Sequence, residues 1–273
     1  MRLQDRVAVV TGGGSGIGEW ICRRFDEEGA HVVVLDIRGE AGALTAGLMK
    51  NDALSFEVDV TDSSQVNRAI EDVKERFGRV DVLVNNAGIV GGDESIRNAE
   101  RLTQRLREVK ATGQVSTPLE ATVHITDDQF RLMMETHVFG AFYCIRAVLP
   151  IMVAQGSGSI VNIGSRCGQE GCVVTPHYST AKGALHALTR VVALDVAESG
   201  VRVNGIAPGF VETPLNAFLS QDALDAAVAA TPIGRQGRPS EIADAAVFLA
   251  SDESSFIVGQ MIAPNGGMNT SPV

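Results

Sequence analysis

Three residues with side chains suited to proton transfer lie close together in the sequence. Tyr178 and Lys182 are four residues apart, a spacing that places both side chains on one face of a helix. An ammonium group beside a phenol favours the phenolate and lowers its pKa toward neutral pH, so the pair could act as a general acid and base. Ser165 follows an apolar run and could hold a substrate oxygen through its hydroxyl. Taken alone, Tyr-x-x-x-Lys could also be a chance pair on a helix.

Composition limits the kinds of protein to consider. The chain has 273 residues, of which 45% are hydrophobic, and no linker divides it, so we expect one domain over 1–273. A net charge of −10 argues against a nucleic-acid surface and against docking on anionic membranes. We expect no apolar run long enough to span a bilayer. The sequence shows no signal-peptide pattern, which favours a cytoplasmic protein.

The four cysteines are Cys22, Cys144, Cys167 and Cys172. Their spacing does not match a metal site, and we expect no bound metal. Free thiols in a reducing compartment are the expected state.

A glycine-rich segment near the start of the chain predicts a nucleotide site. Residues 6–10 read as a buried strand, and residues 19–28 as a helix that stops at Gly29. Between them, glycines let the backbone approach a ligand, and the helix N-terminus offers its N–H groups to a pyrophosphate. The residues expected to contact it are Gly12, Gly14, Ser15, Gly16, Ile17 and Gly18.

Asp36 stands at the end of the next predicted strand, residues 31–35, with Ile37 after it. A carboxylate in this position can accept hydrogen bonds from the adenosine ribose and repels the 2′-phosphate of NADP. The sequence therefore predicts NAD rather than NADP. Arg38 could soften that repulsion.

The pattern continues with strands at 55–58 and 80–84 around a helix at 61–77, capped by Thr61 or Asp62. Strict alternation of strand and helix predicts a doubly wound parallel sheet of the α/β class, whose ligands lie beyond the carboxyl ends of the strands. Asp59 and Asn86 are expected there. A helix cap for Asp59 and a turn-stabilising amide for Asn86 are the alternatives.

Five motifs in order resemble the short-chain dehydrogenase/reductase family. They are Thr11-Gly-x-x-x-Gly-x-Gly18, Asn85-Asn-Ala-Gly88, Ser165, Tyr178-x-x-x-Lys182 and Pro208-Gly209. The resemblance covers nearly the whole chain. It implies a single Rossmann-type domain with a seven-stranded parallel sheet, a nicotinamide cofactor, and a homotetramer or homodimer in which the helix at 175–199 takes part.

The resemblance also implies roles for single residues. Asp59 and Val60 would flank the adenine, Lys182 would hold the nicotinamide ribose, and Tyr178 would lie against the same half of the cofactor. Asn86, Ala87 and Gly88 would line the cleft, Pro208 and Gly209 would form a wall against the nicotinamide, and Val211 and Thr213 would grip its carboxamide.

Two segments differ from the family pattern or vary within it. Residues 91–125 form an insertion with a predicted helix at 95–112. Its apolar face would hold Ile96, Ala99, Leu102, Leu106 and Val109, and its basic face Arg97, Arg101, Arg105 and Lys110. The insertion could serve as a lid or pocket wall, or it could be a surface helix or a subunit contact. Its basic face could bind an anionic substrate or could simply be solvated. Residues 210–232 are the expected substrate lid, whose apolar residues could contact substrate or pack on the core.

His137 stands where the family pattern has asparagine, in a helix predicted over 127–150. In relatives that asparagine ties a water to the catalytic lysine in a proton relay. Histidine also donates and accepts hydrogen bonds, and an ordinary pKa near 6.5 suits a relay. A buried structural histidine is the alternative.

Together these features predict an enzyme that moves hydride between the carbinol carbon of a secondary alcohol and NAD. The catalytic residues would be Ser165, Tyr178, Lys182 and His137, and the partner a small alcohol or ketone. A 3-oxoacyl-[acyl-carrier-protein] reductase is the alternative enzyme, although its usual NADP preference conflicts with Asp36. A silent NAD-sensing protein is the alternative outside enzymes.

Overall fold

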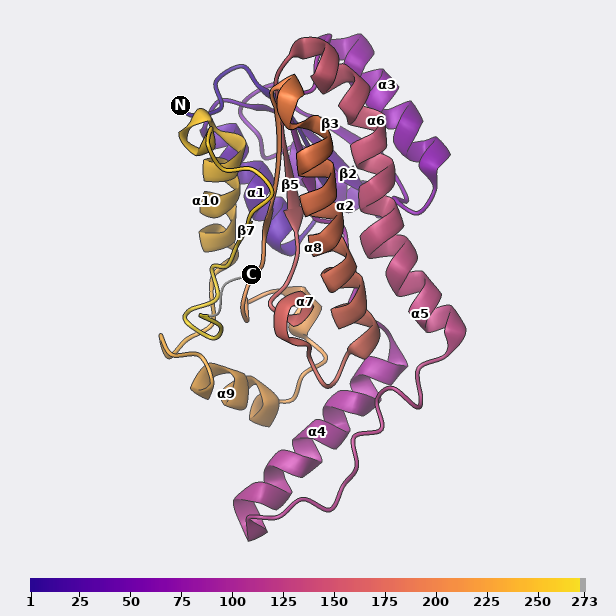
Figure 1. The fold of residues 1–273 in the computed structure, drawn as a ribbon, viewed down its shortest axis with the longest axis vertical. Coiled ribbons are helices and arrows are strands. Elements are labelled where there is room, and N and C mark those ends of the chain that lie inside the picture. Colours follow the sequence, from indigo (N-terminus) through magenta and orange to yellow (C-terminus); the bar gives the residue numbers. More distant parts are fainter. Residues whose placement is uncertain (271–273) are drawn as a thin grey trace.

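Seven strands form one parallel sheet in the order β3-β2-β1-β4-β5-β6-β7 (Figure 1). The computed structural model describes residues 1–270. The strands are β1 Val7–Thr11, β2 His31–Asp36, β3 Leu54–Glu57, β4 Val82–Asn85, β5 Gly158–Ile163, β6 Val201–Ile206 and β7 Met261–Ile262. The order reverses between β1 and β4, which is the switch point where doubly wound folds bind ligands. The predicted fold class is confirmed.

Helices cover both faces of this sheet. On one face lie α1 Gly16–Glu27, α2 Gly39–Ala46 and α10 Pro239–Ala250, and on the other α3 Ser63–Phe77, α6 Gly140–Gln155 and α8 Pro176–Val196. Successive side chains of β1 enter opposite cores: Ala8 and Val10 pack toward α1 and α10, whereas Val7 and Val9 pack toward α3 and α6. This period of two explains why the buried strands are apolar throughout.

Local chemistry sets the ends of the helices. The Asp62 carboxylate accepts the N–H groups of Ser64 and Gln65 and so caps α3, which settles the choice between Thr61 and Asp62. Gly78 ends the same helix in the left-handed conformation. The helix α2 was not expected from the sequence.

The insertion consists of α4 Asp93–Thr112 and a return segment, residues 113–126, without further strands or helices. It projects from the end of the molecule at which the strands finish, where the short helices α7 Cys167–Glu170 and α9 Gln221–Ala229 also lie, and it contacts α9 (Figure 1). A helix is present as predicted, but only part of the predicted apolar face is covered, since Ala99 is buried and Leu102 and Leu106 are half-buried. Ile96 and Val109 are exposed, and the buried residues are Glu94, Ser95, Asn98, Ala99 and Thr103.

The predicted helix over 127–150 is one continuous element with an irregular centre. It comprises α5 Asp127–Met134, a π-helical turn at Glu135–Phe139 and α6. Within residues 1–270 this is the one helix long and apolar enough to cross a membrane, contrary to the expectation of none. Length and composition are weak evidence, because core helices of soluble proteins meet the same criteria. Here Cys144, Ile145, Val148 and Met152 pack on the sheet.

Candidate active site

The loop between β1 and α1 is shaped for a phosphate. Gly12 and Gly16 adopt positive φ angles of 62° and 57°, which disfavour residues with a Cβ. A Cβ on Gly18 would lie 2.1 Å from the Gly12 carbonyl oxygen, so α1 packs directly against the loop. The Ser15 side chain does not cap α1. The first N–H groups of the helix are therefore available to an anion.

Asp36 ends β2 next to this loop and is almost fully buried. Its Oδ2 accepts the Gly14 N–H at 2.8 Å and its Oδ1 accepts the Arg38 N–H at 2.9 Å. The Arg38 guanidinium is mostly exposed and donates to the Ser15 hydroxyl, with its Nε 3.7 Å from the Asp36 carboxylate. A carboxylate and a cation thus stand together at the expected ribose position.

The ends of β3 and β4 complete one side of the site. The Asp59 carboxylate accepts the N–H and hydroxyl of Thr61, so it does not cap α3. Asn86 donates through Nδ2 to the carbonyls of Thr11 and Gly12, both at 3.0 Å. Asn86 therefore fixes the glycine loop, which agrees with the alternative of a turn-stabilising amide. It also lines the cleft, as the sequence predicted.

These segments enclose a cleft of about 550 Å³. The sequence-predicted residues that line it are Gly12, Ser15, Gly16, Ile17, Asp36, Ile37, Asp59, Val60, Asn86, Ala87, Gly88 and Thr213. The sequence did not point to Leu132 and Thr136, which reach the cleft from α5 and the π-helical turn. Helix N–H groups for a pyrophosphate and a carboxylate for a ribose diol suit a dinucleotide, so the cleft fits a nicotinamide cofactor.

Other predicted cofactor residues lie behind or beside the cleft wall. Gly14 packs against the Asp36 carboxylate, where a Cβ would approach Oδ2 to 2.8 Å. Gly18 lies beneath Gly12. The Pro208 carbonyl accepts the Arg166 N–H. The Val211 side chain is buried in the core between α1 and α10.

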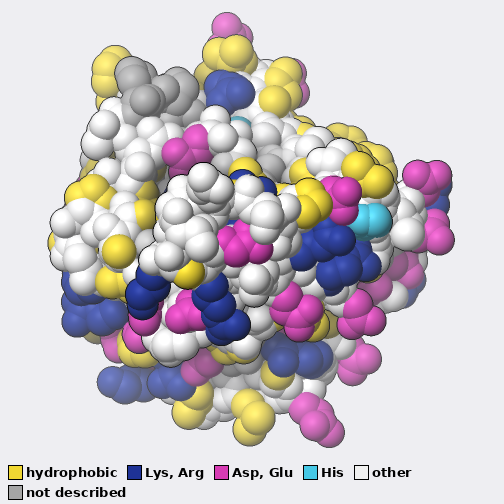
Figure 2. Space-filling view, turned by 90° about the horizontal axis from the view of Figure 1, so that it is seen from below, with side chains coloured by type: hydrophobic (Ala, Val, Ile, Leu, Met, Phe, Trp, Pro, Cys, Tyr) yellow, Lys and Arg dark blue, Asp and Glu magenta, His cyan; other side chains and the backbone are white. Residues whose placement is uncertain are grey.

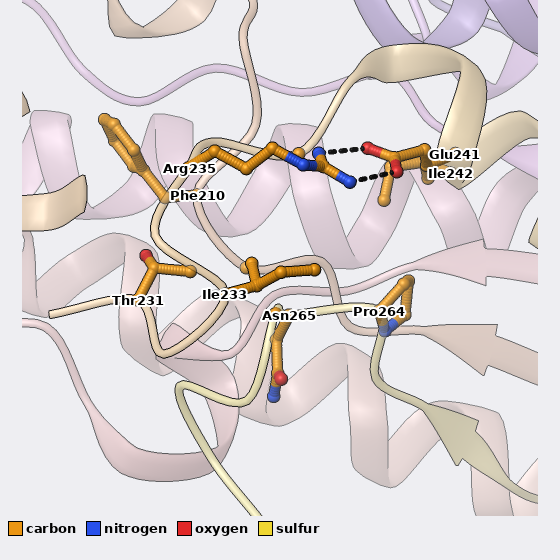
Figure 3. Close-up of a pocket in the computed structure, with 11 residues that line it drawn as sticks. Phe210, Thr231, Ile233, Arg235, Glu241, Ile242, Pro264 and Asn265 are labelled. Carbon is orange, nitrogen blue, oxygen red and sulfur yellow. Dashed lines mark hydrogen bonds and ion pairs between the residues drawn. The ribbon is translucent and has the colours of Figure 1, made fainter. Parts of the chain in front are cut away.

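Gly209 lines a second cavity, of about 130 Å³, rather than the main cleft (Figure 3). Phe210, Ile233 and Pro264 contribute its apolar wall, and a two-point ion pair between Arg235 and Glu241 lies along one side. A Cβ on Gly209 would lie 2.7 Å from the Asn265 Cα. Glycine is therefore required here by close backbone packing.

Ser165, Tyr178 and Lys182 gather where β5 ends against α8. Tyr178 and Lys182 lie one turn apart on α8, with Nζ 5.6 Å from the centroid of the phenol ring. The Ser165 hydroxyl accepts the Cys167 N–H and also bonds to the phenol. Ile89, which lines the cleft, packs against the same cluster as Tyr178. Tyr178 therefore lies next to a residue of the cleft wall.

Burial controls the ionisation of this group. It lowers the pKa of Lys182 from 10.5 to about 7, and Nζ donates to the Ile163 carbonyl at 2.6 Å. Burial raises the pKa of Tyr178 above its ordinary value, and the Ser165 hydrogen bond acts in the opposite direction. The expectation that Lys182 lowers the pKa of Tyr178 is therefore wrong for the protein without ligand, because a buried lysine is not fully charged at neutral pH.

His137 lies in the π-helical turn and is fully buried. Its Nε2 is 2.7 Å from the Ile89 carbonyl oxygen, and its ring meets the Tyr178 ring edge-on at 5.3 Å. A Cβ on Gly88 would lie 2.4 Å from its Cε1, so the histidine requires glycine there. Burial holds the pKa of His137 well below its ordinary value. It is a neutral hydrogen-bonding group at working pH, unlike the titrating relay that its ordinary pKa suggested.

Two of the four cysteines differ from expectation. Cys167 and Cys172 form a disulfide beside Ser165, whereas Cys22 and Cys144 are free and buried. The prediction of four free thiols is therefore wrong for this pair. A separation of five residues in a loop gave no sign of the pairing, since only the turn of α7 brings the two sulfurs together.

For the arginines of α4, the sequence left an anion-binding face and a solvated face both open. Arg97, Arg101 and Arg105 donate to backbone carbonyls of the return segment at His124, Leu119 and Thr117. They fold the insertion onto itself. Figure 2 shows this end of the molecule, where acidic and basic side chains are interspersed and no field of one sign dominates.

Sequence reasoning also missed a buried pair, Glu94 on α4 and His177 on α8, whose side chains approach to 3.3 Å. Burial acts to raise the pKa of Glu94, but N–H donors and His177 outweigh it and hold the pKa below its ordinary value. The residues are far apart in the chain, so no local pattern could join them.

The sheet is doubly wound, the cleft at its switch point fits a dinucleotide, and a buried phenol with an amine one helical turn away packs with Ile89 of the cleft wall. This arrangement is that of a nicotinamide-dependent oxidoreductase acting on CH–OH groups. The chain belongs to the short-chain dehydrogenase/reductase family, because the family model described as short chain dehydrogenase matches residues 6–224.

Relatives agree over nearly the whole length. A 3-oxoacyl-[acyl-carrier-protein] reductase of Thermotoga maritima is 34% identical, covering 98% of this chain and 99% of that protein. A cis-4-hydroxycyclohexanecarboxylate dehydrogenase of Sinomonas cyclohexanicum is 39% identical, covering 96% of each. A 3-ketoacyl-(acyl-carrier-protein) reductase from Brucella melitensis, solved with NADH, has a TM-score of 0.83 at 27% identity, covering 97% of this chain and 99% of that one.

Proposed function

We propose that the protein is an NAD-dependent dehydrogenase that interconverts a small secondary alcohol and its ketone. The observation that carries this proposal is the group of Ser165, Tyr178 and Lys182 at the end of β5 and the start of α8, where Tyr178 packs with Ile89 of the cleft wall. A hydroxyl, a phenol and a nearby amine are the groups needed to hold a carbinol oxygen and move its proton.

Asp36 supports NAD over NADP. Its buried carboxylate sits where the adenosine ribose would lie and repels a second negative charge. Arg38 is paired with Asp36 and with the Ser15 hydroxyl, which reduces its availability to a 2′-phosphate. The NADH bound by the Brucella melitensis protein agrees with this choice.

Each residue has a defined part in the proposed reaction. When bound, NAD supplies the acceptor for the hydride. Ser165 donates a hydrogen bond to the substrate oxygen, and Tyr178 removes the hydroxyl proton during oxidation or returns it during reduction. Lys182, with a pKa of about 7, can take up or release a proton near neutral pH. His137 holds Ile89 and the Tyr178 ring in place as a neutral group.

A homotetramer or homodimer in the cytoplasm is the proposed working form. The support is apolar surface on the layer formed by α6 and α8, where Phe142, Val153, Val191 and Leu194 are exposed. Apolar residues gathered on a helical layer favour association with a second copy.

A 3-oxoacyl-[acyl-carrier-protein] reductase is the second candidate, because relatives from two organisms carry that activity in their names. The two candidates differ in substrate and in the expected cofactor.

One panel tests both candidates. Purified protein is assayed for formation or loss of reduced nicotinamide with secondary alcohols, diols, hydroxysteroids and a 3-oxoacyl thioester, each with NAD and NADP at matched concentrations. We expect turnover of a compact secondary alcohol with NAD. Equal or better turnover with NADP would refute the cofactor choice, and silence toward every substrate despite measurable NAD binding would refute the enzyme.

A further inference from the structure

Apart from Ala99, the buried face of α4 is polar, and each of its polar side chains bonds to a different part of the site. Glu94, Ser95, Asn98 and Thr103 are each less than 7% exposed. A buried polar group is costly unless its hydrogen bonds are satisfied, so this face is built for specific contacts rather than general packing.

The first turns of α4 hold the start of the catalytic helix. The Glu94 carboxylate lies 3.3 Å from Nε2 of His177, which directly precedes Tyr178. It is itself fixed by the Gly92 N–H at 2.9 Å and by Gln129 Nε2 at 2.8 Å. The Asn98 amide donates to the Val174 carbonyl at 3.0 Å, just before the helix begins.

The same turns reach the cleft wall. The Ser95 hydroxyl donates to the Val90 carbonyl at 2.9 Å, next to Ile89. A Cβ on Gly91 would lie 2.4 Å from both Glu94 Oε1 and Ser95 Oγ, so only glycine permits this approach. The start of α4 is thus bonded to the segment after β4 and to the segment before Tyr178.

Further along, α4 holds the lid helix α9. The hydroxyls of Thr103 and Ser220 are 2.7 Å apart. Thr103 uses its proton on the Ala99 carbonyl, so Ser220 must donate to Thr103 while its oxygen accepts the Ala223 N–H and caps α9. Arg107 and Asp222 add an exposed ion pair, which contributes little. Figure 1 shows α4 and α9 at the same end of the molecule.

We propose that α4 is a strut that holds the catalytic helix and the lid at a fixed separation across the substrate site. In this arrangement Glu94 and His177 are positioning residues for Tyr178, and Thr103 positions the lid. The proposal rests on the proposed function for its kinetic readouts. The two ends of α4 affect different kinetic constants. Misplacing Tyr178 slows the chemical step and lowers kcat, whereas loosening the lid weakens substrate retention and raises KM.

The catalytic end is tested with Glu94→Ala. We expect kcat to fall roughly ten- to a hundredfold, the effect of a small misplacement of a reacting group, with the dissociation constant for NAD unchanged. Glu94→Gln keeps a polar partner for His177 but turns an amide NH2 toward the donor of either Gly92 or Gln129, so it should restore only part of kcat. Glu94→Asp withdraws the carboxylate by one methylene and should give a smaller loss, which keeps the test open if the alanine variant does not fold. Glu100→Gln, exposed on the same helix, is the matched control.

The lid end is tested with Thr103→Val, which keeps the side-chain shape and leaves the Ser220 cap in place. We expect KM for the alcohol to rise roughly fivefold, the effect of one lost neutral hydrogen bond, with kcat preserved. Amide hydrogen exchange in α9 should speed up by a similar factor. Thr103→Ser keeps the hydroxyl and should match the wild type.

The exchange measurement needs no substrate, so it separates the strut from the proposed function. If no alcohol is turned over by the wild type, the proposed function fails, but α9 exchange in Thr103→Val against Glu100→Gln still decides the strut. Glu94→Ala and Thr103→Val variants that match Glu100→Gln in kcat, KM and α9 exchange would overturn it.

Discussion

Replacing Lys182 by methionine should stabilise the nucleotide-free protein at neutral pH, although it removes a proposed catalytic group. Lys182 is 4% exposed and its Nζ bonds only to the Ile163 carbonyl among the contacts that the structure describes. Burial lowers its pKa from 10.5 to about 7. The folded protein therefore binds this proton much less tightly than the unfolded chain does, and that difference lowers the stability of the fold.

The size of the effect follows from the two pKa values. At about 1.4 kcal/mol for each tenfold change in proton affinity, the difference amounts to about 4 kcal/mol at pH 7 and about 2 kcal/mol at pH 9. Above pH 10.5 lysine is neutral in both states and the cost disappears, whereas below pH 7 it is fully present. Methionine leaves the Ile163 carbonyl without this donor, which costs about 1 kcal/mol at every pH. The expected net gain is therefore about 3 kcal/mol at pH 7 and about 1 kcal/mol at pH 9.

Urea unfolding of wild type and Lys182→Met at pH 7, 8 and 9, without nucleotide, measures this directly. Lys50→Met is the control, because Lys50 is exposed and its replacement should change stability equally at each pH. His137 and His186 do not disturb the comparison, since burial lowers the pKa of both and they stay neutral in this range. A stability difference that does not shrink as pH rises, or a destabilised methionine variant at pH 7, would refute the assignment of a buried, partly neutral lysine.

Three further predictions concern the surroundings of the site. His137→Ala should lower kcat, because Ile89 and the Tyr178 ring lose a contact. His137→Asn should leave the pH profile of kcat/KM unchanged between pH 5 and 8, because the histidine is neutral throughout that range. A profile that shifts in the asparagine variant would mean that the histidine titrates during turnover. Asp36→Asn should raise the ratio of kcat/KM for NADP over NAD at least roughly fivefold, since removing one charge near another is worth about 1 to 4 kcal/mol; an unchanged ratio would remove Asp36 from cofactor selection. Replacing both Cys167 and Cys172 by serine should lower the free energy of unfolding of the oxidised protein by about 2 kcal/mol, as expected for a short closed loop; urea curves that coincide with wild type would show that the bridge constrains little.

Much of the fold could be read from local patterns. β1, β2 and β5 are short buried runs next to glycine or acidic residues, and Asp62 and Gly78 mark the two ends of α3 by their own backbone chemistry. The helix α2 was not predicted, because Gly39, Gly42 and Gly47 fall in or next to its eight residues and glycine is a poor helix former. Its position is set by packing on β2 and β3, where Gly42 lies close to Val34 and Ser55 respectively.

What the sequence could not give depends on contacts between distant segments. The polar face of α4 is buried because Glu94, Asn98 and Thr103 find partners at His177, Val174 and Ser220, none of them nearby in the chain. The apolar stripe read from the period of the helix therefore included the buried Ala99 but none of these polar residues. The ionisation of Lys182 depends on the depth of its burial, which the four-residue spacing to Tyr178 does not encode.

The most direct test of the account is turnover by Tyr178→Phe with the best alcohol of the panel. Phenylalanine keeps the buried ring and its edge-on contact with His137 and removes only the phenol oxygen. We predict that turnover falls at least about a hundredfold, the contribution of a general acid or base, while the dissociation constant for NAD stays within a factor of two. Turnover within tenfold of the wild type, with NAD still bound, would contradict the role given to this residue.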